Sequence, residues 1–473
     1  MSDPLYQELA DRIGGLIRGG TFASGSRLPS VRRLSREQRV SITTVLEAYG
    51  RLEDQGVIES RPRSGYFVKP PQILNGELPR PAKSIRGPVA VESPEIFKAV
   101  MEAVADPKVV PFGAAVPGDE IVPSRRLSSI SNAVARRYGP AAFRYTMPPG
   151  RRELRTAISR RLLIAGVQAD PDQIVTTQGA TEALSLALRA TTRPGDVVAV
   201  EAPTFFGILH LAQDLNLKVV EVPMDAQEGI DLDALEKISD RHRIKVCIVQ
   251  PNFQNPLGSC MSDQAKRRLV GLAGKQDFIV IEDDLYGDLC HSGPRPRALA
   301  HFDNENRVVL CSSVSKNLAP GLRVGWIVPG RFLEQVKRLK TVHYLSTATH
   351  SELVVAEYLS GGGAERHLRR ISALFSERCI RMREAVIEAF PDGTRVNQPR
   401  GGFVLWVEMP EDYDAEKLAA KALEKGISLI PGSIFSATCR LKHCLRLNCG
   451  FPWNDRAAKA VKTLGSIARS CGP

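Results

Sequence analysis

The sequence predicts an α/β protein in two parts: a small N-terminal domain of three helices and a hairpin, and a large domain built on a mostly parallel sheet. Helix-spaced apolar residues fill the first 69 positions, and from about residue 95 short apolar runs alternate with helix-length segments. A chain of 473 residues, 43% hydrophobic and 25% charged, is too long for one ordinary core and has the composition of a folded protein. We therefore expect a domain at 1–69, a proline-rich linker at 70–94 and a second domain at 95–473.

Composition narrows the classes of function. The formal net charge of +12 favours contact with a polyanion, which makes nucleic acid a candidate partner. The start MSDPLYQELADRIGG has no basic segment followed by an apolar run, and no stretch approaches the roughly 20 apolar residues that span a bilayer. The nine cysteines lack a CxxC pair, and Cys439, Cys444 and Cys449 have the spacing of no structural zinc site. We expect a cytoplasmic protein without a membrane segment or metal, and these three cysteines in its core.

The first domain is expected to begin with two short helices. The apolar stripe of the first helix consists of Leu5, Leu9, Ile13 and Leu16, and the helix ends at the Gly19-Gly20 pair. In RLPSVRRLSREQ, Ser30 is placed as the N-cap of a second helix that buries Val31 and Leu34.

A third helix follows closely, with Ser41 as its N-cap. Its buried positions repeat at helical spacing, at Val45, Ala48, Tyr49 and Leu52. This leaves Ile42, Thr43 and Thr44 exposed near its start. The second and third helices are short and joined by a tight turn, and the third begins with small polar residues. This arrangement predicts a helix-turn-helix in which the third helix enters the major groove of DNA.

The segment VIESRPRSGYFV then predicts a two-stranded wing with a basic tip. Arg61, Arg63, Ser64 and Gly65 occupy the tip, where guanidinium groups can contact phosphates and glycine allows close backbone approach. Residues 1–69 carry 11 Lys and Arg against 8 Asp and Glu, a surplus of only +3. Phosphate contacts should therefore come from placed residues such as Arg32, Arg61 and Arg63.

The runs LPSVRRLS, SITTVLEAY and LEDQGVIESRPRSGYFV resemble the GntR family of winged helix-turn-helix regulators. The resemblance implies a double-stranded DNA operator as partner. One departure is Arg33, where the family often carries Glu, so a capping box is lost and local positive charge rises.

The linker contains six prolines between Pro70 and Pro94 and little apolar periodicity. In a polyproline-like state of about 3.1 Å per residue, it could extend on the order of 70 Å. That length would allow the DNA-binding domain to reach another subunit.

Short apolar runs separated by helix-length segments predict a parallel sheet covered on both faces. The runs are QIVTT, DVVAV, KVVEVP, VCIVQP, FIVIEDD and RVVLCSS. From about His350, long helices alternate with FVLWVEM, ISLIP and LRLNCG, which predicts a smaller C-terminal α+β lobe. The cleft between the lobes is the expected ligand site.

The segment CSSVSKNLAPGLRVGW combines a lysine with groups that suit a phosphate. Lys316 follows Ser313 and Ser315, and Arg323 lies seven residues further on. A lysine that forms a Schiff base must lose its proton, and hydroxyls beside an arginine bind phosphate. A surface lysine in a polar loop is the commoner arrangement, but it leaves the companion motifs unexplained.

Four companion motifs follow predicted strands. Gly179-Ala180-Thr181 opens a helix, where free backbone N–H groups form a phosphate cup. Asp283 ends a buried strand with Tyr286 three residues later, and a buried carboxylate needs a cation such as a protonated pyridine. Asn255 in PNFQNPLG suits a phenolate oxygen, and Phe205 in EAPTFFG suits stacking on a ring. The carboxyl ends of parallel strands converge, so we expect one site.

In this order and spacing, residues 100–473 resemble fold-type I aminotransferases, and the whole chain resembles the MocR subfamily of GntR regulators. The resemblance implies bound pyridoxal 5'-phosphate (PLP), a homodimer, and Lys316, Asp283 and Tyr286 as the catalytic set. Lys316 would form the internal aldimine and Asp283 would bind the pyridine nitrogen. The other implied cofactor contacts are Asn255 and Tyr286 to the ring oxygen, Ala180, Thr181, Ser313, Ser315 and Arg323 to the phosphate, and Tyr145 to the partner subunit's phosphate.

The resemblance also implies a substrate site at Arg446 in LRLNCG, which matches an arginine that binds a substrate α-carboxylate, with Asn255 beside it. An ordinary salt bridge is the alternative for Arg446. Phe205 stands where many relatives have Tyr, and Ala115 where relatives often have Gly, which leaves the shape of the substrate open.

Two functions fit these motifs. In the first, a small amino acid or amine effector reacts at the Schiff base of Lys316, binds Arg446 and modulates DNA binding through lobe closure. In the second, the chain is a working PLP-dependent aminotransferase, and the first domain controls its expression or location. The first is favoured because a dedicated enzyme has no need of a 69-residue DNA reader.

Overall fold

The computed structural model describes most of the chain, namely residues 4–18, 22, 25–54, 57–61, 64–69, 76–82, 87–92, 102, 106 and 108–472. It divides into two compact units, Met1–Asn75 and Gly76–Pro473. The predicted helix stop at Gly19-Gly20, the wing residue Arg63 and much of the predicted linker lie outside the described residues. Among the helices that are described, none is long and apolar enough to cross a bilayer.

The small unit has the predicted order of three helices and a hairpin. Its elements are α1 (Leu5–Arg18), α2 (Val31–Gln38), α3 (Ile42–Asp54), β1 (Ile58–Arg61) and β2 (Gly65–Val68). Both predicted N-caps are confirmed: the Ser30 side chain accepts the backbone N–H of Arg33 at 3.3 Å, and the Ser41 hydroxyl accepts that of Thr44 at 3.0 Å. The strands pair antiparallel, so the unit is a winged helix-turn-helix.

The predicted stripe of α1 is wrong at both ends. Leu9 and Ile13 are buried, but Leu5 is 61% exposed and Leu16 is 41% exposed. The buried positions instead include Ala10, with Tyr6 and Ile17 packed against the same core. At 100° per residue this centres the buried face roughly 60° away from the predicted stripe.

The third helix supplies the centre of this core. Its predicted buried residues Val45, Ala48, Tyr49 and Leu52 are all at most 1% exposed. The Tyr49 hydroxyl donates a 2.8 Å hydrogen bond to the carbonyl of Pro29, just before α2, and its ring packs 4.7 Å from that of Tyr66 on β2. Tyr49 therefore connects the two helices of the helix-turn-helix to the wing.

The large unit is built on an eight-stranded sheet in the order β4-β11-β10-β9-β8-β5-β6-β7. The strands are β4 (Val175–Thr177), β5 (Val197–Ala202), β6 (Lys218–Asp225), β7 (Gly229–Ile230), β8 (Ile244–Val249), β9 (Ile279–Asp283), β10 (Val308–Ser313) and β11 (Gly325–Val328). All six predicted apolar runs are confirmed as strands, and the five from β10 to β6 run parallel. Strand β11, which inserts antiparallel between β4 and β10, was not predicted from the sequence.

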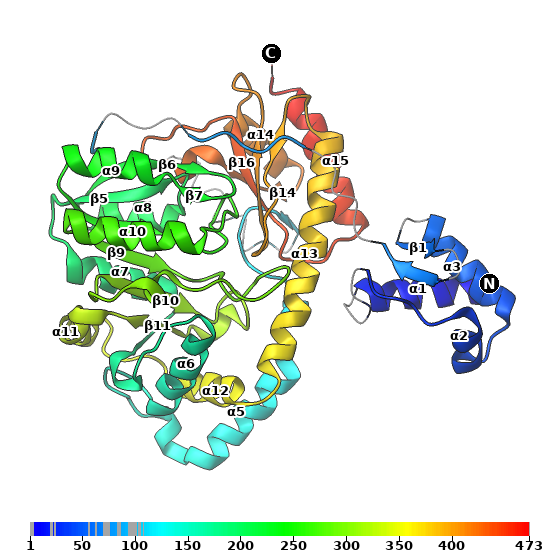
Figure 1. Ribbon diagram of the computed structural model, residues 1–473, viewed down its shortest axis with the longest axis horizontal. Helices are drawn as coiled ribbons and strands as arrows, with labels where there is room; N and C mark the ends of the chain where they lie inside the picture. Colours follow the sequence, from blue (N-terminus) through cyan, green and yellow to red (C-terminus); the bar gives the residue numbers. More distant parts are fainter. Residues whose placement is uncertain are drawn as a thin grey trace. The chain divides into compact units, whose positions relative to one another are not determined.

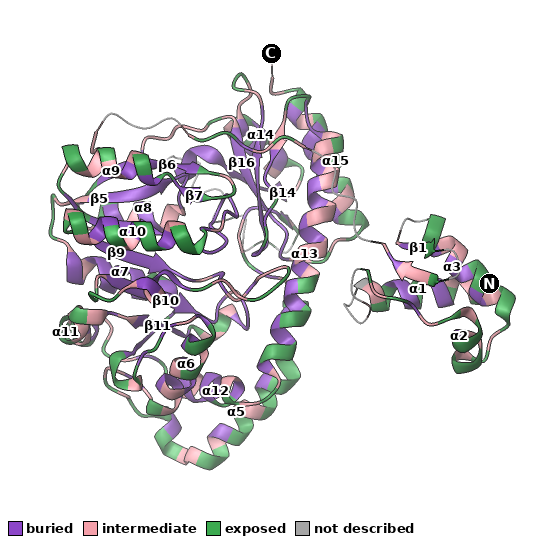
Figure 2. Cartoon of the chain, in the orientation of Figure 1, coloured by how far each residue is buried: buried purple, intermediate pink, exposed green. Residues whose placement is uncertain are grey.

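Helices cover both faces of this sheet, as the unbroken apolar runs predict. Adjacent residues of β5 show the two faces: Val198 belongs to the core beneath α7 (Ala180–Thr191) and α8 (Phe206–Asp214), whereas Ala199 belongs to the core beneath α9 (Leu232–Arg241) and α10 (Asp263–Gln276). Figure 1 shows the layers, and in Figure 2 the strands are buried while the outer sides of α9 and α10 are exposed. The carboxyl ends of the parallel strands remain as the edge that can carry a site.

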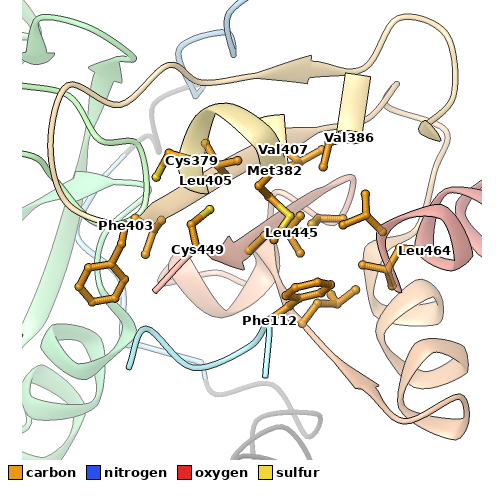
Figure 3. Packing of buried hydrophobic residues seen from close by; sticks show 14 of the residues in the cluster. Phe112, Cys379, Met382, Val386, Phe403, Leu405, Val407, Leu445, Cys449 and Leu464 are labelled. Carbon is orange, nitrogen blue, oxygen red and sulfur yellow. The ribbon is translucent and has the colours of Figure 1, made fainter. Parts of the chain in front are cut away.

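The smaller lobe combines a four-stranded sheet, in the order β12-β13-β16-β15, with the separate strand β14 and long helices. Its elements are β12 (Arg395–Val396), β13 (Val404–Glu408), β14 (Ile427–Ser428), β15 (Ile430–Pro431), β16 (Cys444–Asn448), α13 (Ala364–Ala389), α14 (Ala415–Glu424) and α15 (Asp455–Arg469). In Figure 3, side chains from α13, β13, β16 and α15 meet in one core. β3 (Val110–Pro111) pairs with β14, so an early segment joins this mainly C-terminal lobe. Cys444 and Cys449 are buried as predicted, whereas Cys439 is only half-buried.

The remaining helices are α5 (Ser124–Tyr138), α6 (Arg152–Ile164), α11 (Leu333–His343) and α12 (Thr349–Ser360). α5, α6 and α12 bury one shared apolar cluster, while α11 joins the core beneath α7 and α8.

The described residues of 76–92 lie against the large unit, although the sequence predicted them within an extended linker. The backbone N–H of Arg80 donates to the carboxylate of Glu408 at 2.8 Å. Val89 forms an antiparallel bridge with Val219 on β6. This segment therefore contacts both the smaller lobe and β6 of the large sheet.

Substitution of Tyr49 by Phe tests how the winged helix-turn-helix is held together. The change leaves the partly buried carbonyl of Pro29 without its donor, which costs about 1–2 kcal/mol. We expect amide hydrogen exchange in α3 of the full-length protein to become about tenfold faster. Tyr66→Phe is the control, because no hydrogen bond of its hydroxyl is seen among the described residues. Equal exchange rates for the two variants would contradict this role of Tyr49.

Candidate functional site

The structure brings the predicted cofactor residues together at the carboxyl ends of the parallel strands. Asp283 ends β9, Ser313 ends β10, and Asn255 lies in the loop after β8. Arg446 arrives from β16 of the smaller lobe and hydrogen-bonds the Asn255 side chain. Charge interactions connect Lys316 with Asp283 and Arg446, so the groups share one electrostatic environment.

The Lys316 side chain is partly buried, and its Nζ donates a 2.6 Å hydrogen bond to the backbone carbonyl of Ala115. Burial lowers the pKa of Lys316 to about 8, with the charge of Arg446 as the next cause, while Asp283 acts in the opposite direction. A lysine with a pKa near 8 is a neutral nucleophile over part of the physiological range. This is the property that a Schiff-base lysine needs.

Asp283 and Tyr286 are buried beside Lys316 and keep polar atoms without partners. Asp283 is 2% exposed, and its Oδ2 accepts a 2.6 Å hydrogen bond from Gln250. Burial raises the pKa of Asp283 to about 7. Burial also raises the pKa of Tyr286, which is 1% exposed. Within the described residues, neither Oδ1 of Asp283 nor the Tyr286 hydroxyl has a hydrogen-bond partner.

Arg446 is a buried cation held by neutral groups. Its guanidinium donates to Oδ1 of Asn255 at 3.0 Å and to the carbonyl of Gly113 at 2.6 Å, and it lies 5.1 Å from the ring centre of Phe435. Burial lowers the pKa of Arg446 to about 10. Among the described residues Arg446 forms no ion pair, so the structure does not support the salt-bridge alternative. A buried guanidinium without a carboxylate is suited to a ligand that supplies one.

The turn before α7, where a phosphate cup is predicted, brings Gly179 and Arg323 together. Gly179 has φ +87°, and a Cβ there would lie 2.7 Å from Nη2 of Arg323. Arg323 donates to the carbonyl of Gln178 at 2.8 Å and reaches Oγ of Ser315 at 3.5 Å. Glycine therefore lets the guanidinium lie directly against the start of the helix, where anions bind.

The other predicted phosphate contacts lie around this cup. Ala180 and Thr181 begin α7, so their backbone N–H groups belong to its unpaired first turn. Ser313 is buried, and its hydroxyl accepts the backbone N–H of Ser315 at 3.2 Å.

Phe205 and Tyr145 complete the predicted cofactor set from different positions. Phe205 lies half-buried at the start of α8, with its ring 4.7 Å from that of Phe206. Tyr145 is 77% exposed, as a residue that serves a second subunit would be.

These observations together test whether the site fits PLP. The ligand needs an amine, an acid for its ring nitrogen, donors for its ring oxygen and an anion cup for its phosphate. Lys316, Asp283, Asn255 with Tyr286, and the cup at 179–181 provide these groups. The unpaired Asp283 and Tyr286 atoms match the polar positions of such a ligand. The residues present fit the cofactor.

Sequence reasoning missed Gln250, which binds Asp283, and Glu201, which lies behind it. Gln250 directly follows β8, as a polar residue at the end of the apolar run VCIVQ. A polar residue at such a strand end is the signal that identified Asp283, so Gln250 could have been found in the same way. The carbonyl contacts of Gly113 and Ala115 had no such signal.

A separate cavity of about 740 Å³ lies elsewhere in the large unit. Residues of α5, α6 and α12 and of the segment before α6 line it, including Arg137, Arg151 and Arg155. None of the predicted cofactor residues lines this cavity, so its size does not identify the site.

In the small unit, the predicted DNA-binding residues form an exposed surface on α2 and α3. Arg32 is exposed on α2, and Thr43 is exposed at the start of α3. Ser41 caps the helix, and Thr44 is half-buried with its hydroxyl 2.8 Å from that of Ser41. The start of α3 is thus free to meet a groove.

The wing places Arg61 at the end of β1, beside the turn. Arg61 forms a 2.7 Å ion pair with Glu59 and stacks 4.4 Å from the ring centre of Phe67. The backbone N–H of Ser64 donates to the Arg61 carbonyl at 2.9 Å, and Gly65 has φ +99°. A DNA phosphate would therefore compete with Glu59 for Arg61. Arg63 lies outside the described residues.

Comparison with known proteins divides the chain in the same way. Residues 5–68 match the gntR family of bacterial regulatory proteins, and residues 109–460 match the family of class I and II aminotransferases. The chain is 37% identical to the uncharacterized HTH-type transcriptional regulator YdcR of Escherichia coli K12, over 98% of both chains. It is 36% identical to YjiR, a similarly described regulator of that organism, over 97% of this chain and 98% of YjiR.

The large unit is also similar to solved aminotransferases. A crystal structure of Pyrococcus horikoshii kynurenine aminotransferase, in complex with PMP, superposes with a TM-score of 0.75 at 30% identity. The match covers 80% of this chain and 95% of that one.

The pKa of Lys316 predicts how the apoprotein captures PLP. Capture needs the neutral amine, so its rate should rise with pH and level off above about pH 8. Stopped-flow absorbance after mixing apoprotein with PLP measures this profile. In Arg446→Met the loss of a nearby cation should move the midpoint upward. A wild-type rate that still rises near pH 10, as for an ordinary lysine, would contradict the assignment.

Proposed function

Because the chain belongs to the regulators of MocR-type architecture, a GntR-type helix-turn-helix joined to a class I and II aminotransferase domain, we propose that it is a PLP-dependent DNA-binding transcription regulator. A small amino acid or amine effector modulates its binding to a double-stranded operator. The observation that supports the proposal is that one chain contains both the helices and strands of a winged helix-turn-helix and a group of buried residues that fit PLP.

Residues of the large unit would hold the cofactor at three places. The cup at 179–181 with Arg323 holds its phosphate, Asp283 its ring nitrogen and Asn255 with Tyr286 its ring oxygen. When bound, PLP supplies an electron-withdrawing ring and an aldehyde carbon that reacts with amines. Lys316, with its lowered pKa, is the amine with which an effector competes.

The charge of the site indicates which effectors it prefers. Arg446 is buried and held by the neutral groups of Asn255 and Gly113. A carboxylate of the effector gives this guanidinium a counter-charge and favours an amino acid over a simple amine. An effector of this kind changes DNA binding only if it binds two states of the protein with different affinity.

The proposal includes a homodimer in the bacterial cytoplasm. Tyr145 is exposed, which supports a role at the partner subunit's phosphate site. A DNA operator as partner is compatible with the cytoplasm.

A working aminotransferase is the second candidate function. Lys316, Asp283, Asn255, Tyr286 and Arg446 provide the groups that transamination uses, and the Pyrococcus relative is an aminotransferase. Multiple turnover with an amino acid and a keto acid, unaffected by deletion of residues 1–69, would favour this function over the regulator.

Replacement of Lys316 by Ala separates cofactor sensing from DNA binding. We expect Lys316→Ala to lose the absorbance band of lysine-bound PLP and the response of DNA affinity to amino acids, with basal DNA affinity unchanged. Absorbance spectra and fluorescence anisotropy with labelled DNA measure these properties. Lys218→Ala, which removes an exposed lysine from β6, is the control and should retain both. An undiminished effector response in Lys316→Ala would refute the sensor.

Arg61→Ala tests the wing. Loss of one phosphate contact should lower DNA affinity about tenfold and reduce the slope of log affinity against log salt by about one. Arg193→Ala removes an equal charge from an exposed position on the large unit and should leave the slope unchanged. The wing assignment fails if both variants keep the wild-type slope.

A further inference from the structure

The two oxygens of the Asp283 carboxylate have different surroundings. Oδ2 accepts a 2.6 Å hydrogen bond from Nε2 of Gln250, whereas Oδ1 is buried without a partner among the described residues. Both side chains are deeply buried, Asp283 at 2% exposure and Gln250 at 3%. A buried carboxylate oxygen that lacks a donor is costly, so Oδ1 is the oxygen available to a donor on a ligand.

Only one orientation of the Gln250 amide satisfies both of its neighbours. Its Oε1 accepts the backbone N–H of Asn255 at 2.8 Å. Because a backbone N–H can only donate, Oε1 must face Asn255, and the Nε2 hydrogens must face Asp283. The Gln250 side chain therefore links Asp283, which is assigned to the ring nitrogen, with Asn255, which is assigned to the ring oxygen.

A second buried acid supports this arrangement from behind. Glu201, at the end of β5 and 1% exposed, accepts the backbone N–H of Gln250 and the Nε2 of Gln254, both at 3.1 Å. Burial, with the charge of Asp283 as a smaller cause, raises the pKa of Glu201 to about 8. Gln254 also donates to the carbonyl of Pro203 at 2.8 Å. The backbone at Gln250 is thus fixed independently of its side chain.

We propose that Gln250 is a positioning residue of the cofactor site, which keeps Asp283 ionised with Oδ1 free for the ring nitrogen and fixes Asn255 beside the ring oxygen. The inference rests on the proposed function, because it requires that PLP binds. A neutral donor to a buried carboxylate favours its charged form. Without the Gln250 amide, Asp283 would keep its proton to higher pH, since burial already favours the neutral acid.

Gln254 provides a matched comparison for this role. It belongs to the same loop, is fully buried, and forms hydrogen bonds with Glu201, Pro203 and the backbone N–H of Leu257. Among the described residues none of its hydrogen bonds involves Asp283. A residue that merely stabilises the loop should behave as Gln254 does.

The test is a pH titration of the absorbance of PLP bound to full-length wild type, Gln250→Met and Gln254→Met. The midpoint reports the proton on the Lys316 nitrogen. A neutral Asp283 no longer holds a proton on the ring nitrogen, and loss of that positive charge makes the Lys316 nitrogen more basic. We expect the midpoint of Gln250→Met to rise by about one pH unit, and that of Gln254→Met to stay within a few tenths.

A second variant keeps the test decisive if Gln250→Met does not fold. Gln250→Asn carries the same amide on a shorter stem, which cannot hold both partners, and its midpoint should rise in the same direction. Unmoved midpoints in the folded Gln250 variants, or an equal shift in Gln254→Met, would overturn the inference. Wild-type protein without any absorbance band of lysine-bound PLP would instead overturn the proposed function.

Discussion

In the proposed regulator, the chemistry of the large unit depends on keeping the buried Asp283 carboxylate charged. Burial at the end of β9 raises its pKa to about 7, and the hydrogen bond from Gln250 and the charge of Lys316 oppose that effect. Lys316 is affected in the opposite sense, because burial and Arg446 lower its pKa to about 8. The pKa values of Asp283 and Lys316 thereby lie close together, so a small change of charge in a ligand alters the protonation of both groups.

The sequence could predict most of this site because parallel strands place their carboxyl ends along one edge. Asp283, Asn255 and Ser313 were each recognisable as polar residues beside apolar runs. Arg446 was identified through family resemblance, since β16 lies in the other lobe and no local pattern connects it to Asn255. Gln250 was not predicted, although it directly follows an apolar run and so carries the same strand-end signal.

The differences between the predicted and the observed fold arise from contacts between elements that are distant in the sequence. The antiparallel strand β11 was missed because Gly325–Val328 is a short segment immediately after the lysine motif, and its direction depends on pairing with β4 and β10. The stripe of α1 was misplaced because tertiary contacts select Ala10 over Leu16, a choice that apolar spacing alone does not determine. The buried face of α3, which packs against α1, α2 and β1, was predicted correctly.

The described residues of 76–92, which pack against the large unit, limit the distance that the DNA-binding unit can reach from Gly76. It leaves six residues between Lys69 and Gly76, and this length of chain spans at most about 25 Å, compared with roughly 70 Å for a wholly free linker. In the proposed homodimer, the spacing between two operator half-sites would therefore be governed chiefly by where Gly76 leaves each large unit. Half-site spacing would then be a property of the large unit of the proposed homodimer, and a change in that unit would alter the preferred operator geometry.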